Sequence, residues 1–332
     1  MSRVLRFDSP IIIAFVFAVA LLVSGCASEP EGPLAFASNE DGDTVSVIDI
    51  ATNEVVATIP AGDRPRGIRS GPQGERIYVA VSNDEAIAII DATTYEVLGT
   101  VPGGSDPEQF DVHPTGDRLY VSNEDANQAT AVSLPDGEIL ATMQTGIEPE
   151  GVRVSPNGKW AYVTGESSNS ISVIDADSNK VIKNVRVGTR PRGIAFTPDG
   201  TTAYVTGEIA GVISVMDVET HAVTDTIEIS PTAKPVDVVT SPDGARAFAS
   251  LGGADAVVVI DVSTNEIVQQ VPVGMRPWGI DISNDGTRVY VANGPSGTVS
   301  VINTETLEEV ATVTVGEMPW GVAIAQPRQG AE

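Results

Sequence analysis

The sequence predicts an all-β fold, a seven-bladed β-propeller of four-stranded antiparallel blades, over residues 34–325. Two landmarks with a period of about 42 residues support this prediction. An aromatic residue that opens a short apolar run recurs at Phe36, Tyr78, Tyr120, Tyr162, Tyr204, Phe248 and Tyr290. A proline recurs in the same rhythm at Pro65, Pro107, Pro149, Pro191, Pro235, Pro277 and Pro319. Repeats of this length with four short strands each are typical of propeller blades.

One repeat illustrates the four predicted strands. The β-rich runs are Gly193–Thr197, Thr202–Thr206, Val212–Asp217 and Ala222–Ile227, and turn-forming residues such as Pro198-Asp199-Gly200 separate them. Apolar residues occupy both faces of many such runs, as expected where a blade packs against a neighbour on either side. An aspartate closes the third strand of most repeats, where its short side chain can fix the following turn.

The two ends of the repeat region complement each other. The first run, Leu34–Ser38, has the pattern of a second strand, and the last, Trp320–Ile324, has the pattern of a first strand. We expect these N-terminal and C-terminal strands to pair, which closes the ring and removes its exposed edges.

Residues 1–25 are predicted to be a lipoprotein signal peptide. An apolar run, Ile11–Val23, follows two arginines and is too short to span a bilayer comfortably. The segment Val23-Ser24-Gly25-Cys26 resembles the lipobox of bacterial lipoproteins, in which the cysteine is lipidated. The alternative is an ordinary signal peptide with an incidental cysteine.

Cys26 is the single cysteine and can form no internal disulfide. We therefore expect a lipidated Cys26 and tether at 26–33, the propeller at 34–325 and a C-terminal tail at 326–332. The expected location is exported and lipid-anchored, on the periplasmic side or the cell surface.

The formal charge of −26, from 45 acidic and 19 basic residues, limits the partners of this protein. Such a surface repels nucleic acid and anionic membranes at long range. We do not expect a nucleic-acid partner, and we expect membrane attachment through the lipid anchor only. Both a saline habitat and an ordinary acidic periplasmic protein remain compatible with this composition.

Little in the sequence indicates catalysis. The two histidines, His113 and His221, are both predicted to lie in surface turns, which argues against a nucleophile–histidine arrangement. The segment Asp41-Gly42-Asp43 lacks the full ligand spacing of a calcium loop. The prediction is no catalytic residue, no metal site and no cofactor.

The residues beside the recurring prolines vary between repeats and are the candidates for binding. They are expected on the same face as the second-to-third strand connections, a face that we call the mouth. The candidate residues for a ligand or partner are Arg64, Arg66, Arg190, Arg192, Arg276, Trp278 and Trp320. Arginine and tryptophan are frequent binding anchors. In the alternative interpretation, the arginines form a solvated ion-pair belt with glutamates such as Glu40, Glu124, Glu166 and Glu208.

The repeats resemble a known family. Tyr162-Val163-Thr164, Tyr204-Val205-Thr206 and Gly188-Thr189-Arg190-Pro191-Arg192-Gly193 are similar to the YVTN-type β-propeller repeat. Motifs such as Asp106-Pro107-Glu108-Gln109-Phe110 and Pro319-Trp320-Gly321 are closest to the seven-repeat propellers associated with catabolism dependent on pyrroloquinoline quinone (PQQ). The resemblance implies an exported propeller and supplies no catalytic residue, although related propellers include lactone hydrolases and amine dehydrogenase subunits.

The expected function is therefore that of a non-enzymatic binding or scaffolding propeller, a membrane-tethered monomer whose mouth takes a protein partner or a small anionic ligand. Two alternatives remain. One is a periplasmic auxiliary protein of PQQ-dependent alcohol oxidation that binds the quinone or its dehydrogenase. The other is a propeller enzyme, a lactone hydrolase or dehydrogenase subunit, with a site on the axis.

Overall fold

The computed structural model describes residues 32–325, and these form 28 β-strands and no helix. The predictions for residues 1–25, for Cys26 and for the tail at 326–332 lie outside the described residues, as does most of the predicted tether. In the described part of the chain, no helix has the length and hydropathy needed to cross a membrane.

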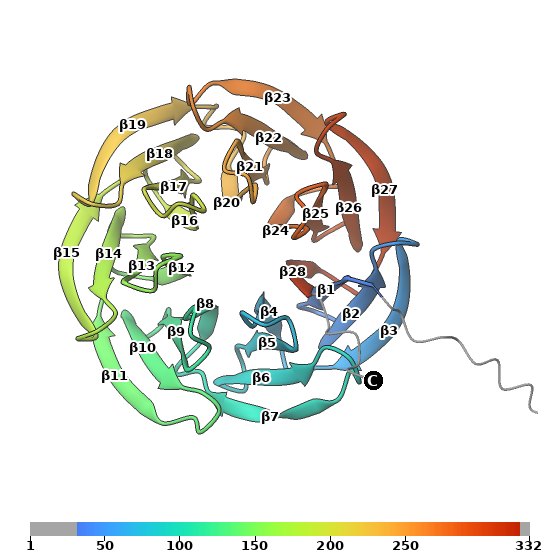
Figure 1. Cartoon of the computed structure of the whole chain (residues 1–332), viewed down its shortest axis with the longest axis horizontal. Helices are drawn as coiled ribbons and strands as arrows, with labels where there is room; N and C mark the ends of the chain where they lie inside the picture. The colour runs from blue at the N-terminus through green and yellow to red at the C-terminus, as the bar shows by residue number, and fades with distance from the viewer. Residues whose placement is uncertain (1–31, 326–332) are drawn as a thin grey trace, which may run out of the picture. The chain divides into compact units, whose positions relative to one another are not determined.

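The strands form seven antiparallel four-stranded sheets, which surround one axis as the blades of a propeller (Figure 1). Each blade begins at the axis and ends at the outer rim. Blade 1 contains β28 (Pro319–Ala325), β1 (Leu34–Asn39), β2 (Thr44–Asp49) and β3 (Glu54–Pro60). Blade 2 contains β4 (Pro65–Ser70), β5 (Arg76–Val81), β6 (Ala86–Asp91) and β7 (Val97–Pro102). Blade 3 contains β8 (Pro107–Val112), β9 (Arg118–Asn123), β10 (Gln128–Ser133) and β11 (Ile139–Gln144).

The other four blades repeat this order. Blade 4 contains β12 (Pro149–Val154), β13 (Trp160–Gly165), β14 (Ser170–Asp175) and β15 (Lys180–Arg186). Blade 5 contains β16 (Pro191–Phe196), β17 (Thr202–Gly207), β18 (Val212–Asp217) and β19 (Ala222–Glu228). Blade 6 contains β20 (Pro235–Thr240), β21 (Arg246–Leu251), β22 (Ala256–Asp261) and β23 (Ile267–Pro272). Blade 7 contains β24 (Pro277–Ile282), β25 (Arg288–Asn293), β26 (Thr298–Asn303) and β27 (Glu308–Thr314). The predicted all-β, seven-bladed fold is confirmed.

The turn after the third strand is fixed as the sequence predicts. Asp49 Oδ1 accepts hydrogen bonds from the backbone N–H groups of Ala51 and Thr52, at 2.7 and 3.2 Å. Asn303 does the same in blade 7. The recurrent acidic residue at this place is therefore a turn former.

The hydrophobic core lies between blades. Seven clusters of buried side chains are found among the described residues, and each joins two neighbouring blades. The middle strands supply most of them, because both of their faces are covered, whereas the outer strands are largely exposed. No blade can bury its apolar faces without both neighbours, so the ring is stable only when it is complete.

The ring closes through β1 and β28, which pair antiparallel with Leu34 opposite Ala325 and Phe36 opposite Ala323. Val322 and Ile324 of β28 belong to the cluster between blades 7 and 1. The predicted pairing of the terminal strands is confirmed.

Truncation after Glu317 is expected to unfold or aggregate the protein. This change removes β28, which exposes the edge of β1 and opens the cluster between blades 7 and 1. Melting temperature and size-exclusion chromatography measure the outcome. Truncation after Ala325, which keeps β28, serves as the control. A melting temperature that stays the same after the first truncation would contradict the role assigned to the closure.

Candidate functional site

The residue before each recurring proline projects from a left-handed backbone conformation. The φ angles are 61° at Arg64, 57° at Arg190 and 48° at Arg276. A side chain from the preceding blade holds this turn: the backbone N–H of Arg64 donates to Asp43 Oδ1 at 3.0 Å, and that of Arg276 donates to Asp255 Oδ1 at 2.7 Å. Asp43 of the Asp41-Gly42-Asp43 segment therefore has a structural role.

Two predicted mouth residues, Arg64 and Arg66, lie in ion pairs. Glu40 Oε1 accepts from Nε of Arg64 at 3.1 Å and from Nε of Arg66 at 2.9 Å. Arg64 also lies 3.5 Å from Asp106, and Arg66 pairs with Glu108 of the next blade. These contacts join blades 1, 2 and 3 at the mouth.

Arg192 lies buried among three glutamates. It pairs with Glu150, and its Nη1 is 3.2 Å from both Glu166 Oε1 and Glu208 Oε2. Only 10% of its side chain is exposed, so this is not a solvated surface pair. Arg190, at the rim of the mouth, lies 2.8 Å from Glu166 and 3.3 Å from Glu208.

The two tryptophans link these charged groups across the closure. Trp278 and Trp320 meet edge to face, with ring centroids 5.6 Å apart. The guanidinium of Arg66 lies 5.8 Å from the Trp320 ring, and that of Arg192 lies 5.3 Å from the Trp278 ring. These contacts connect Arg66 to Arg192 through Trp320 and Trp278.

Arg276 differs from the other arginines of the mouth. It is exposed and stacks 5.2 Å from the Trp278 ring, and it has no ion pair with any residue of the described range 32–325. Arg64, Arg66, Arg190 and Arg192 thus form ion pairs with acidic residues, as in the alternative interpretation, but the pairs of Arg66 and Arg192 are largely buried rather than solvated. The assignment of all seven candidates as ligand-binding residues stays a prediction.

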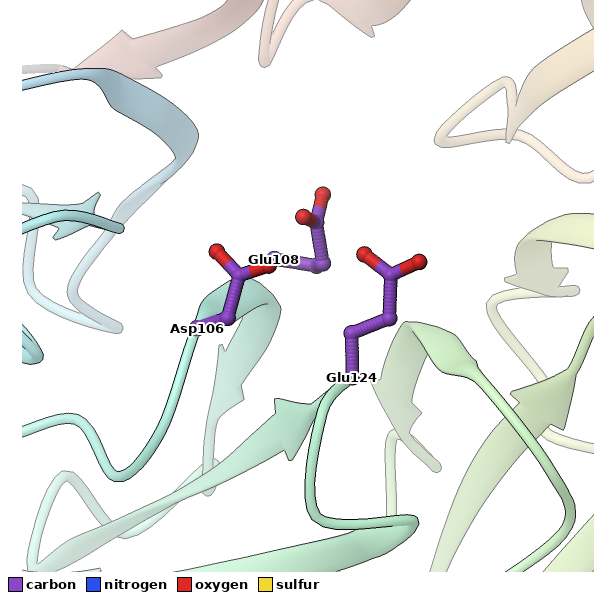
Figure 2. A group of neighbouring side chains, drawn as sticks. All are labelled: Asp106, Glu108 and Glu124. Carbon is purple, nitrogen blue, oxygen red and sulfur yellow. The ribbon is translucent and has the colours of Figure 1, made fainter.

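A group of three carboxylates faces the mouth in blade 3 (Figure 2). One oxygen from each of Asp106, Glu108 and Glu124 lies within 4.8 Å of the others, a spacing that could hold a metal ion. Arg64 and Arg66 already compensate Asp106 and Glu108. Glu124 has no cation within ion-pair distance in the described part of the chain. The expectation that no metal binds stays a prediction.

The protonation states of the mouth glutamates diverge. The pKa of Glu166 is raised to about 8. The causes are burial, a hydrogen bond with the carboxyl group of Glu150, and the negative charge of Glu150. Burial opposes ionisation of Glu150 as well, but Arg192 and this hydrogen bond hold the pKa of Glu150 below its usual value. Burial and the negative charges of Glu150 and Asp106 raise the pKa of Glu124. The mouth therefore holds a protonated and an ionised carboxyl group side by side.

A second charged layer, which the sequence analysis did not identify, lies along the inner strands. Burial raises the pKa of Asp111 and of Asp281 to about 6, although Arg69 opposes the shift. Asp111 Oδ2 accepts from the N–H of Val154 at 2.8 Å, and Asp281 Oδ2 accepts from that of Ile324 at 2.9 Å. These aspartates join neighbouring blades near the axis. Both aspartates stand four residues after a recurring proline, and this shared position is the sequence pattern that could have identified them.

The prediction that both histidines lie at the surface is wrong. They lie in turns, but each is buried. The ring of His113 bonds to Gly158 O at 2.9 Å, and that of His221 bonds to the hydroxyl of Tyr162 at 2.8 Å. Each turn is covered by an adjacent blade, which accounts for the burial.

One protein-family model matches less than half of the chain. The model of the family described as "Lactonase, 7-bladed beta-propeller" matches residues 179–320. A search of curated protein sequences gave no match.

Solved structures share the fold. A candidate 6-phosphogluconolactonase from Bacteroides uniformis is 22% identical, with a TM-score of 0.74, over 89% of this chain and 100% of that one. A second, from Bacteroides fragilis, is 16% identical, with a TM-score of 0.76, over 90% and 99%. Kuenenia stuttgartiensis hydrazine synthase is 22% identical, with a TM-score of 0.72, over 78% and 89%. At these identities the structures support the seven-bladed fold alone.

The expectation of a non-enzymatic binding or scaffolding propeller is wrong. The lactonase family match over residues 179–320 contradicts it and supports the enzyme alternative. Glu150 and Glu166 belong to no histidine or metal motif in the sequence. Their different protonation states arise only from burial beside Arg192 in the folded protein.

The free energy of unfolding is expected to fall as the pH rises from 6 to 8. Because the folded protein raises the pKa of Glu166 to about 8, it binds more protons than the unfolded chain in this range, and raising the pH favours unfolding. Glu166→Gln should flatten this slope, whereas the exposed Glu305→Gln should leave it unchanged. Urea unfolding at several pH values measures both. Equal slopes in the parent and Glu166→Gln would contradict the raised pKa.

Proposed function

We propose that this protein hydrolyses a lactone at the mouth of the propeller, close to the axis. The family match over residues 179–320 supports the reaction class. The observation that carries the proposal is that burial beside Glu150 keeps Glu166 protonated, while Glu124, also at the mouth, has no cationic partner in the described range. Pairs of carboxyl groups held in different states are the usual way to combine a general acid with a general base.

Lactone hydrolysis needs a base to activate water and an acid to protonate the departing ring oxygen. Glu124 is assigned as the base, because its carboxylate has no cationic partner in the described range and its pKa is raised. Glu166 is assigned as the acid, because its pKa of about 8 keeps it protonated at neutral pH. Arg190, half-exposed beside Glu166, is assigned to stabilise the oxyanion that forms when water attacks the carbonyl.

Arg276 is assigned to hold an anionic substituent of the substrate. The repeats explain why this arginine has no acidic partner among residues 32–325. Arg190 lies between Glu166 and Glu208, whereas the corresponding positions around Arg276 are Gly252 and Gly294. A carboxylate or phosphate on the substrate would supply the missing negative charge, and Trp278 would cover one side of it.

We further propose that the protein is exported and is anchored to a membrane through a lipidated Cys26. This part of the proposal rests on the sequence from Ile11 to Cys26. The closer similarity to propellers of PQQ-dependent catabolism also stays a prediction. It rests on motifs such as Asp106-Pro107-Glu108, which contribute to the same mouth.

Glu124→Gln is expected to lower kcat for lactone hydrolysis about 100-fold, because the amide cannot accept a proton from water. Arg276→Ala is expected to raise KM for an aldarolactone, which carries a free carboxylate, and to leave KM for neutral δ-valerolactone unchanged. Proton release in a weakly buffered indicator assay measures both. Glu305→Gln, in an exposed turn, is the matched control. The proposal fails if neither lactone is hydrolysed faster by the parent than by Glu124→Gln.

A further inference from the structure

Three blade tyrosines, Tyr120, Tyr162 and Tyr204, form a hydrogen bond through the hydroxyl to a side chain of the next blade, an interaction that we call the latch. The hydroxyl of Tyr120 donates to Asn179 Oδ1 at 2.7 Å, and that of Tyr204 donates to Asn265 Oδ1 at 3.0 Å. In each case the partner lies in the turn between the third and fourth strands of the next blade. His221 is the partner of Tyr162 in the same geometry.

The latch is absent at the four other blade aromatics of the described range: Phe36 and Phe248 have no hydroxyl, and the hydroxyl of Tyr290 is buried without a partner. Between blades 2 and 3 it is absent because the partner side chain is missing. Gly137 occupies the position that corresponds to Asn179 and has no side chain to meet Tyr78. Tyr78 is 7% exposed, whereas the six other blade aromatics are 0% exposed. Its hydroxyl makes no hydrogen bond within the described range 32–325.

An open cavity of about 530 Å³ occupies this place. Its walls include Arg76, Tyr78, Ile89, Leu98, Leu134 and Pro135. A smaller cavity of about 170 Å³ adjoins it and shares Arg76, Tyr78 and Gly116. The combined surface has an apolar wall from blades 2 and 3. Its polar side chains are those of Arg76, Tyr78 and Thr100 in the larger cavity, with Gln73, Glu75 and Thr115 in the smaller one.

Arg76 presents an exposed guanidinium to a ligand here. In blades 3 and 6 the corresponding arginine is engaged: Arg118 Nη1 donates to Ala176 O at 3.2 Å, and Arg246 donates to Thr304 O. Arg76 makes no such bond to a residue of the range 32–325. Asp91 lies opposite it in the strand pair and interacts with its charge, while the N–H groups of Thr93 and Thr94 also bind Asp91 Oδ1, at 2.9 and 3.0 Å.

The polar groups of the larger cavity favour a ligand that accepts hydrogen bonds. Its lining contains no carboxylate, while the Arg76 guanidinium and the Tyr78 hydroxyl can both donate. Burial raises the pKa of Tyr78, although Arg76 opposes this, so the phenol keeps its proton at neutral pH. A carboxylate satisfies both donors, and Arg76 supplies the compensating charge.

We propose that this cavity binds a small monocarboxylate with an apolar body. The carboxylate accepts from Arg76 and Tyr78, and the apolar part packs against Ile89, Leu98 and Leu134. The site belongs to the interface of blades 2 and 3. It involves none of the mouth residues, and it is independent of the proposed hydrolysis.

Titration calorimetry with octanoate and with neutral octanamide tests this site. The parent should bind octanoate saturably and octanamide at least about tenfold more weakly, because the amide lacks the charge. Arg76→Gln should weaken octanoate binding about tenfold as well. Arg288→Gln, at the corresponding position of blade 7, should leave it unchanged.

Gly137→Asn supplies the side chain that partners the tyrosine in other blades, and we expect it to reach Tyr78 and occupy part of the cavity. The φ of Gly137 is 72°, a conformation that asparagine adopts at the same place in other blades, at 51° in Asn179 and 59° in Asn265. An added Cβ would lie 3.2 Å from Pro102 Cδ and 3.3 Å from Val101 Cγ1, so these side chains must shift slightly. The variant should lose octanoate binding. Equal affinity of the parent for acid and amide, or undiminished binding by Arg76→Gln and Gly137→Asn, would overturn the proposal.

Discussion

The arrangement of the mouth depends on one buried cation. Arg192 compensates the charges of Glu150 and Glu208 and contacts the protonated Glu166; these glutamates come from blades 4 and 5. Taking these groups out of water is costly, and mutual repulsion would drive the carboxylates apart without the guanidinium. The same contacts lower the pKa of Glu150, whereas burial beside that carboxylate raises the pKa of Glu166. The interaction that joins the blades is thus also the source of the acid proposed for catalysis.

Departures from the repeat carry the functional information. The glutamates that surround Arg190 are replaced by Gly252 and Gly294 beside Arg276, and this leaves a cation without an acidic partner in the described range. Gly137 likewise replaces the latch residue and leaves Tyr78 facing a cavity. In both places the backbone keeps its repeat geometry while a side chain is absent. A ring of near-identical blades can therefore gain a binding site through a single small residue.

The fold could be predicted almost completely because its signals are local and repeated. Periodicity located β16 to β19 within two residues at every end and identified β1 and β28 as partners. The candidate site could be predicted only in part. The proline-flanking positions identified Arg192 and Trp278 as mouth residues. Their contact, and the protonation of Glu166, depend on burial between blades and cannot be seen in a linear pattern. The lactonase family match was not anticipated, because Glu150 and Glu166 acquire different protonation states only after this packing.

The most direct test of the account is a double-mutant cycle between Arg192→Ala and Glu150→Ala, measured by urea unfolding. If the buried pair organises the mouth, each single change destabilises strongly by leaving a charge unpaired, and the double variant is little worse than either single one. The account predicts a coupling free energy of at least about 2 kcal/mol. Additivity to within about 0.5 kcal/mol would show that Arg192 and Glu150 act independently, and it would contradict the central role of this interaction.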